Sequence, residues 1–171
     1  FELGSKIIDT VEISPYPSGK IIEDRLYTKN FLVNIFDVII KNKGALIIID
    51  YGQLEENFIN GNTLQGVLKH KSSDIFKNTG LTDLSSWVNF SDFIKDLPKE
   101  IKYQGPITQK EFLINLGIKS RFENLAKNKS ATERRLLFTQ FERLVSSSHM
   151  GQAFKVMILY SENMKSFEGF K

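Results

Sequence analysis

Residues 44–52 read Gly-Ala-Leu-Ile-Ile-Ile-Asp-Tyr-Gly, and this stretch decides the fold class. Its apolar residues, Ala45 to Ile49, do not alternate with polar ones. Such a run predicts a strand that is covered on both faces, as in the centre of a parallel sheet. Asp50 then stands at the carboxyl end of the strand, where open parallel sheets bind ligands, and Gly52 permits a sharp turn or a close approach. The stretch therefore predicts an α/β protein with a site at Asp50.

The composition is that of one globular domain, with 171 residues, 41% hydrophobic and 25% charged. The absence of cysteine excludes disulfides, thiolate zinc sites and cysteine nucleophiles, and two histidines argue against a His-rich metal centre. The net charge of +3 is small and its charges are interspersed, so we expect no nucleic-acid partner. No apolar run approaches the ~20 residues that span a bilayer. We therefore expect no metal site and no membrane span.

The order of elements predicts alternating helices and strands. Imperfect alternation predicts short strands within residues 3–13, and helical spacing predicts a helix over 31–42 that leads into the strand 45–49. Residues 53–80 read as a long loop with at most a short helix near 63–70. A short helix near 90–97 and strands at 101–104 and 153–160 follow, and the tail beyond Ser161 is expected to fray.

Two helix starts carry the capping-box pattern, at Thr108-Gln-Lys-Glu111 and Ser130-Ala-Thr-Glu133. A further helix is expected between them, over 118–127. Met150-Gly151 reads as a tight turn before the last strand.

The candidate site residues each have a structural alternative. Asp50 and Tyr51 bind a ligand or, at about even odds, cap a turn and pack a ring. Thr63 and His70 place a hydroxyl and an imidazole in the loop after the strand, but a lone histidine is more often a surface or capping group. Asp83 lies near Trp87 in a stretch that also fits a capped helix entry. Gln109 begins a helix, whose amino terminus can bind anions, although Thr108 competes as its cap.

Several motifs, taken in order, closely resemble the MidA family of class I S-adenosylmethionine-dependent methyltransferases, which is linked to assembly of respiratory complex I. They are Val11–Pro15, Ala45–Gly52, Thr63–Gln65 with His70, Thr82–Phe90, Gly105–Leu113 with Leu116–Ile118, and Met150–Val156. The resemblance implies a partial Rossmann-like sheet, strands five to seven, with a helical insertion. Residues 1–171 would be the carboxyl-terminal part of one methyltransferase domain, and 53–150 would hold the family's loop and insertion.

The same resemblance implies methyl transfer from S-adenosylmethionine to protein arginine. It makes Asp50 and Tyr51 the catalytic candidates, because a carboxylate can hold the guanidinium and accept its proton. Gly52, Thr63, His70, Asp83 and Gln109 become the substrate-binding candidates. The implied partner is a protein substrate such as a complex I subunit. The implied location is the mitochondrial matrix in a eukaryote and the cytoplasm in a bacterium.

One departure from the family limits this expectation. The family's cofactor-binding loop is rich in glycine, but no Gly-x-Gly occurs in this chain. We therefore expect that the chain is a carboxyl-terminal fragment and that the cofactor-binding residues lie upstream of Phe1. We also expect that the chain alone binds S-adenosylmethionine weakly or not at all. A non-catalytic interaction or assembly module is the alternative. Half a sheet also leaves an edge exposed, which predicts self-association.

Overall fold

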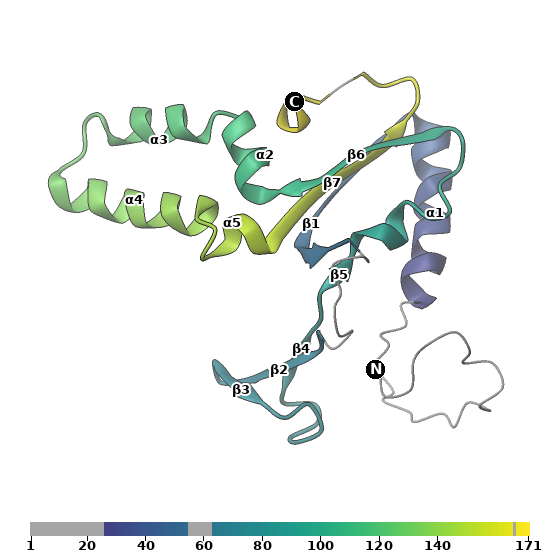
Figure 1. Ribbon diagram of the computed structural model, residues 1–171, viewed down its shortest axis with the longest axis horizontal. Helices are drawn as coiled ribbons and strands as arrows, with labels where there is room; N and C mark the ends of the chain where they lie inside the picture. The colour runs from purple at the N-terminus through teal and green to yellow at the C-terminus, as the bar shows by residue number, and fades with distance from the viewer. Residues whose placement is uncertain (1–25, 55–62, 166) are drawn as a thin grey trace.

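The computed structural model describes residues 26–54, 63–165 and 167–171, so the strands expected within 3–13 lie outside the described residues. The fold is mixed α/β. A four-stranded sheet with both parallel and antiparallel pairs forms its centre, with strand order β5-β1-β7-β6 (Figure 1). Its strands are β1 (Ala45–Gln53), β5 (Val88–Asn89), β6 (Ile101–Thr108) and β7 (Phe154–Ser161). β1 is parallel to β5, and β7 is antiparallel to both β1 and β6. The three strands predicted in this part of the chain are confirmed, and β1 and β6 extend further than expected.

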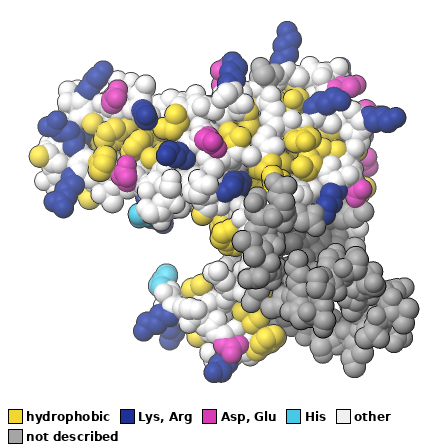
Figure 2. Space-filling model, viewed as in Figure 1, with side chains coloured by type: hydrophobic (Ala, Val, Ile, Leu, Met, Phe, Trp, Pro, Cys, Tyr) yellow, Lys and Arg dark blue, Asp and Glu magenta, His cyan; other side chains and the backbone are white. Residues whose placement is uncertain are grey.

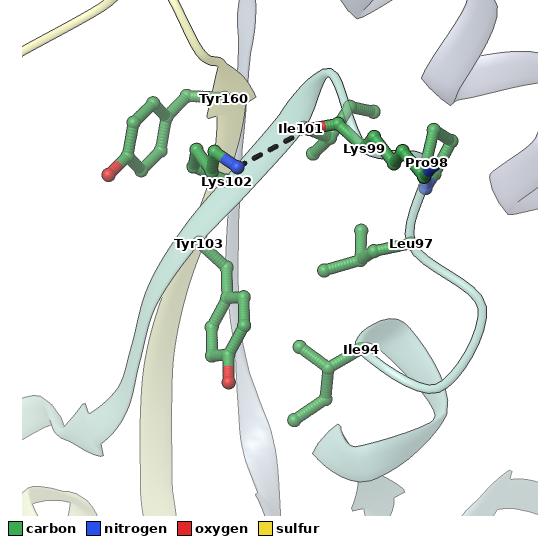
Figure 3. Close-up of a pocket in the computed structure, with 8 residues that line it drawn as sticks. All are labelled: Ile94, Leu97, Pro98, Lys99, Ile101, Lys102, Tyr103 and Tyr160. Carbon is green, nitrogen blue, oxygen red and sulfur yellow. Dashed lines mark hydrogen bonds between the residues drawn. The ribbon is translucent and has the colours of Figure 1, made fainter.

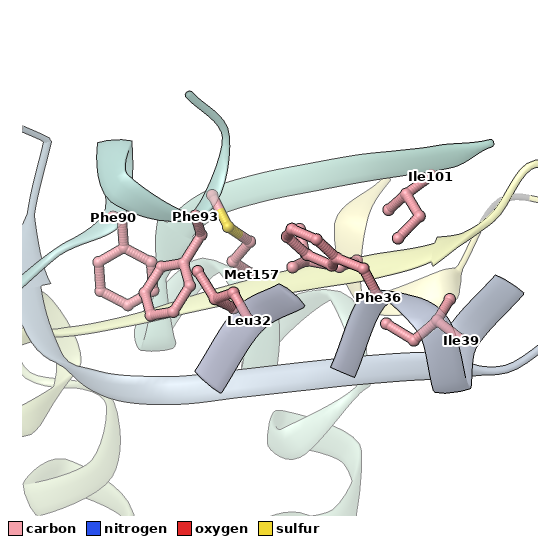
Figure 4. Packing of buried hydrophobic residues seen from close by; sticks show 8 residues of the cluster. Leu32, Phe36, Ile39, Phe90, Phe93, Ile101 and Met157 are labelled. Atoms are coloured by element: carbon pink, nitrogen blue, oxygen red, sulfur yellow. The ribbon is translucent and has the colours of Figure 1, made fainter. Parts of the chain in front are cut away.

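Helix α1 (Leu26–Asn42) covers one face of this sheet and confirms the predicted helix over 31–42. Its buried residues Leu32, Phe36 and Ile39 recur at helical spacing and lie against the sheet (Figure 4). The cluster that they join contains Phe90, Phe93, Ile101, Met157 and Leu159. Since α1 leads directly into β1, helix and strand bury their apolar residues in one core.

The second face of the sheet is covered over β6 and β7 but not over β1. Val156 and Ile158 of β7 are buried, and helices α2 (Gln109–Asn115) and α5 (Met150–Ala153) pack over β6 and β7. Ile47 and Ile49 of β1 are 53% and 51% exposed. The prediction that β1 is covered on both faces is therefore wrong within the described chain. The expected parallel sheet is also only partly found, because β1 pairs antiparallel with β7.

A helical arm projects from the sheet, in the part of the chain where the resemblance implied a helical insertion (Figure 1). It consists of α3 (Ile118–Ala126) and α4 (Ala131–Val145). Both predicted capping boxes are present, at Thr108 with Glu111 and at Ser130 with Glu133. Where a tight turn was expected at residues 150 and 151, the chain instead makes the one-turn helix α5.

The carboxyl-terminal tail does not fray as expected, because it packs on α2. The 3-10 helix η3 (Glu168–Phe170) brings Phe170 to Phe112, with ring centroids 5.3 Å apart. Asn115 Nδ2 donates to the carbonyl oxygens of Gly169 and Lys171 at 3.2 and 2.7 Å. These contacts hold the end of the chain on the body.

A second, small sheet lies in and just after the stretch 53–80, which was expected to be a long loop with at most a short helix near residues 63–70. Its strands are β2 (Gln65–Leu68), β3 (Lys71–Ser73) and β4 (Asp83–Ser85), in the order β3-β2-β4. The helix expected over 90–97 is the shorter 3-10 helix η2 (Phe90–Phe93), and Asn89 caps it by accepting from the Ser91 amide. In the described ranges, no helix has the length and apolar character needed to cross a membrane.

The capping box of α4 gives a pH prediction. Hydrogen bonds from Lys129 and Ser130 lower the pKa of the exposed Glu133 carboxyl from 4.5 to about 2. Because the folded pKa is depressed, the stabilisation is present above pH 4.5 and is lost as the pH falls toward 2. A carbon-detected NMR titration of the Glu133 carboxyl is expected to show this low midpoint, and Ser130→Ala is expected to raise it. A wild-type midpoint near 4.5 would contradict the capping assignment.

Candidate functional site

Asp50 lies near the carboxyl end of β1 but does not end it. The strand continues through Gln53 because Gly52 and Gln53 pair with Val88 and Asn89 of β5, so the expectation that the strand stops before Asp50 is wrong. Asp50 Oδ1 accepts a hydrogen bond from the Tyr51 amide at 2.8 Å. This bond fixes the carboxylate and leaves Oδ2 to meet another donor.

Asp50 and Tyr51 project to opposite faces of the sheet. Asp50 lies directly opposite Lys155 of β7, on the face that α1 covers, whereas Tyr51 lies opposite Phe154. The rings of Tyr51 and Phe154 meet edge to face, with centroids 5.4 Å apart and planes at 89°. The two predicted catalytic residues are therefore neighbours along the strand but offer their side chains to different spaces.

A charged row beside Asp50 was not found from the sequence. Lys155 lies between Asp50 on β1 and Thr108 on β6, and Lys155 Nζ donates to the Gln152 carbonyl oxygen. Glu111 Oε2 accepts from the Thr108 amide at 2.8 Å and from its hydroxyl at 2.7 Å. The signal in the sequence is a single lysine inside an otherwise apolar strand.

The two charged members of this row influence each other. Hydrogen bonds from the Thr108 hydroxyl and amide lower the pKa of the Glu111 carboxyl, and the positive charge of Lys155 adds to this effect. Burial lowers the pKa of the Lys155 ammonium, while the Glu111 carboxylate partly restores it. The sheet therefore carries a partly desolvated cation one strand away from Asp50.

Gly52 is buried where β5 crosses close to β1. A Cβ atom at this position would lie 2.1 Å from the Val88 carbonyl oxygen and 3.0 Å from the Phe90 ring. We therefore expect Gly52→Ala to lower the free energy of unfolding by about 1 to 3 kcal/mol, measured by urea denaturation. Gly44→Ala is the matched control, since its Cβ would meet nothing nearer than 3.9 Å. Equal stability of the two variants would contradict the close approach of β5.

Thr63 is connected to the end of β1 through β5. Its hydroxyl oxygen accepts from the Trp87 amide at 2.8 Å, next to Val88, which pairs with Gly52. His70 lies at the turn between β2 and β3, at the other end of β2 from Thr63, and is exposed. Asp83 is exposed on β4, opposite Val67. Of these substrate-binding candidates, Thr63 is therefore the one tied to the strand end that carries Asp50.

Gln109 is buried and its amide group is engaged within the protein. Gln109 Nε2 donates to the Leu144 carbonyl oxygen at 2.9 Å, which joins the start of α2 to the end of α4. The structure thus gives Gln109 a role in anchoring the helical arm. Its role in binding substrate stays a prediction.

A shallow groove of about 460 Å³ lies at the opposite end of the sheet. Figure 3 shows Tyr103 of β6 facing Ile94 and Leu97 across it, with Lys102 Nζ donating to the Lys99 carbonyl oxygen. Tyr103 pairs with Leu159, which pairs with Leu46 near the start of β1. The groove is therefore separate from the Asp50 end.

The fold and the position of Asp50 can be compared with known proteins. Residues 5–107, more than half of the chain, match the family Methyltransf_28, described as "Putative S-adenosyl-L-methionine-dependent methyltransferase". The chain belongs to this methyltransferase family. The sequence motifs of the chain resemble the same family. The sheet with helices packed on it agrees with the methyltransferase fold that the resemblance implied.

Curated relatives carry a more specific name. The protein arginine methyltransferase NDUFAF7, mitochondrial, of Danio rerio is 32% identical over 68% of this chain and 27% of its own length. The proteins of that name from Xenopus tropicalis and Homo sapiens are 34% and 29% identical over 66% and 88% of this chain. This methyltransferase-family chain therefore spans less than a third of the length of the curated relatives that it matches.

Two solved structures of one superfamily from Burkholderia thailandensis share the fold. One has a TM-score of 0.78 at 23% identity and covers 88% of this chain and 41% of its own. The other, bound to S-adenosyl-homocysteine, has a TM-score of 0.72 at 22% identity and covers 87% of this chain and 39% of its own. More than half of each larger fold has no counterpart in this chain.

The residues present do not by themselves fit S-adenosylmethionine. The sequence has no Gly-x-Gly loop, and the described carboxyl end of β1 offers one carboxylate and two rings without a phosphate- or carboxylate-binding loop. The described residues also contain no group of three side chains able to hold a metal ion. The described residues alone therefore do not form a complete cofactor site.

Proposed function

We propose that the chain supplies the substrate side of an S-adenosylmethionine-dependent protein arginine methyltransferase that acts in respiratory complex I assembly. The Danio rerio and Homo sapiens relatives, which match more than two thirds of this chain, are named protein arginine methyltransferases, which supports the arginine assignment. The observation that carries the proposal is the part-buried Asp50 near the carboxyl end of β1, within the methyltransferase sheet. The proposed substrate is an arginine of a complex I subunit.

Asp50 has the chemistry that an arginine substrate requires. A guanidinium is a planar cation with donors in a fixed fork, and a carboxylate is its natural acceptor. The Tyr51 amide holds Oδ1 of Asp50, so Oδ2 can orient the substrate and take its proton as the methylated nitrogen loses it. On the other face, the edge-to-face rings of Tyr51 and Phe154 form an apolar wall at the same strand end.

We propose that the rest of the site joins at the edge of β1. Ala45–Tyr51 pair with β7 on one side, and within the described chain only Gly52 and Gln53 pair on the other. The unpaired backbone of that edge is suited to accept a further strand, and the exposed Ile47 and Ile49 on the adjoining face of the sheet are suited to a covering element. We propose that the portion present in the longer relatives adds there and brings the cofactor to Asp50.

Cofactor binding tests this proposal. By isothermal titration, the chain alone is expected to bind S-adenosylmethionine weakly or not at all, whereas a complex with the unmatched portion of the Danio rerio relative is expected to bind it. Tight binding by the chain alone would overturn the division of the site. A stable complex that binds cofactor but methylates no arginine would instead favour the second candidate, a non-catalytic assembly module, which the missing Gly-x-Gly also favours.

Without that portion, the open edge of β1 gives a physical expectation. We propose that the isolated chain self-associates through this edge, because exposed strands pair with one another. Sedimentation velocity is expected to show oligomers, and the charged variant Ile49→Lys is expected to shift them toward monomer. A wild-type chain that sediments as a monomer at all concentrations would contradict this.

For the location we propose the mitochondrial matrix, as the names of the relatives suggest, or the cytoplasm if the chain is bacterial.

A further inference from the structure

The α3–α4 arm leaves a small apolar surface exposed at its outer part. Phe122 of α3 meets Phe141 and Phe138 of α4, with ring centroids 5.1 and 6.2 Å apart. Phe138 nevertheless remains 50% exposed, and Leu125, one turn after Phe122, is 48% exposed. Figure 2 shows hydrophobic side chains gathered on this arm with Lys and Arg around them. The two helices therefore pack together but do not fully bury their shared apolar side chains.

Two arginines border this surface by helical spacing. Arg121 precedes Leu125 by four residues on α3, and Arg134 precedes Phe138 by four residues on α4, so each shares a face with its apolar neighbour. Both are exposed, and among the described residues no ion pair joins either arginine to a carboxylate. We call Arg121, Leu125, Arg134 and Phe138 the arm patch.

The charge of the arm decides what the arm patch suits. Residues 118–145 contain seven Lys and Arg and three Glu, which gives a net charge of +4, whereas the whole chain carries +3. The remainder of the chain is therefore slightly negative. One of the three glutamates, Glu133, is already paired with Lys129. The net positive charge of the whole chain thus resides in this projecting arm.

We propose that the arm patch docks an acidic amphipathic segment of a partner protein. Its carboxylates would meet the guanidinium groups of Arg121 and Arg134, which can bind them in bidentate fashion, and its apolar side chains would cover Leu125 and Phe138. A second copy of this chain does not suit the patch, because two arms of the same sign repel. An apolar centre with a charged rim is the usual anatomy of a protein interface. The inference requires neither cofactor nor Asp50, so it stands apart from the proposed catalysis.

Fluorescence anisotropy with a designed probe tests the proposal. The probe is a labelled amphipathic peptide with leucines along one helical face and glutamates beside them. Arg134→Glu in the whole chain is expected to weaken its binding by about tenfold or more. The matched control is Arg143→Glu, which makes the same charge change nine residues later on the opposite face of α4 and is expected to leave binding within about twofold. Leu125→Ser tests the apolar contact and is expected to weaken binding as well.

Four results would overturn the docking site, and the first three concern the peptide, the control variant and membranes. They are no binding of the peptide to the wild-type chain, an equal loss from Arg134→Glu and Arg143→Glu, and binding to vesicles of anionic phospholipid without binding to the peptide. Far-ultraviolet circular dichroism of each variant shows whether its helix content is that of the wild type, so that a loss of binding is not mistaken for a loss of folding. An Arg134→Glu variant with wild-type helix content and wild-type affinity would also reject the proposal.

Discussion

Phe90→Ala is expected to lower the free energy of unfolding by about 3 to 5 kcal/mol, the usual cost of removing a fully buried phenylalanine ring. Phe90 has 0% of its surface exposed and lies in the cluster between α1 and the sheet. Its ring meets Phe93 at 5.8 Å and also lies close to Gly52. Loss of the ring would leave a cavity where η2, α1 and β1 meet. Urea denaturation followed by circular dichroism measures the effect.

Phe76→Ala is the control for this loss, because Phe76 is 73% exposed. The same chemical change at that position is expected to alter the free energy of unfolding by less than about 0.5 kcal/mol. If the two variants were equally stable, η2 would not pack on the core as described.

Asp50→Asn is expected to reduce methyl transfer by about 10²-fold or more in the chain complemented by the missing portion of the domain. The asparagine keeps an oxygen for the Tyr51 amide, so the strand should stay intact, but it loses the negative charge that holds the guanidinium and accepts its proton. The measurement is the rate of methyl incorporation into an arginine-containing protein substrate at saturating cofactor.

Asp37→Asn is the matched control, since Asp37 is exposed on α1, a helix that contributes no site residue. It is expected to leave the rate unchanged. An Asp50→Asn variant with the wild-type rate would exclude Asp50 from the reaction. An Asp50→Asn variant with a raised KM and an unchanged kcat would limit the role of Asp50 to binding.

Local signals in the sequence predicted the helices of the arm well. A capping box depends on residues three apart, and both predicted boxes form with their reciprocal hydrogen bonds. Gly117 separates α2 from α3 with a φ of 81°, a conformation that glycine adopts without cost. Each of these features is complete within a few residues, so no distant partner is needed to predict it.

The β2–β3 hairpin was missed because its turn lacks the usual residues. Lys69 and His70 both have positive φ, 49° and 62°, as in a tight hairpin turn. Such turns favour asparagine and glycine, so Lys-His gives no turn signal in the sequence. The short apolar stretch before it then resembles a helix as much as a strand. Pairing with β4, far along the chain, decides for the strand.

The strand that carries the candidate site residues was predicted, but the surroundings of those residues were not. The apolar run before Asp50 identified the correct strand, since its location is confirmed, although the cover expected on both of its faces is not found in the described chain. Alternation along the strand puts Tyr51 on the other face, and the register with β7 places Lys155 beside Asp50. The bond from Gln109 to Leu144 spans 35 residues, so its anchoring role was equally hidden from local patterns.

Arginine methylation by the complemented domain tests the central claim most directly. The chain would be mixed with the portion of the Danio rerio relative that it does not match, together with S-adenosylmethionine and a mitochondrial complex I fraction. Mass spectrometry of arginine residues is expected to find new methylation with the complete mixture, none with either polypeptide alone, and almost none with Asp50→Asn. Methylation by the chain alone, or undiminished methylation with Asp50→Asn, would contradict the assignment of this chain to the substrate side of the enzyme.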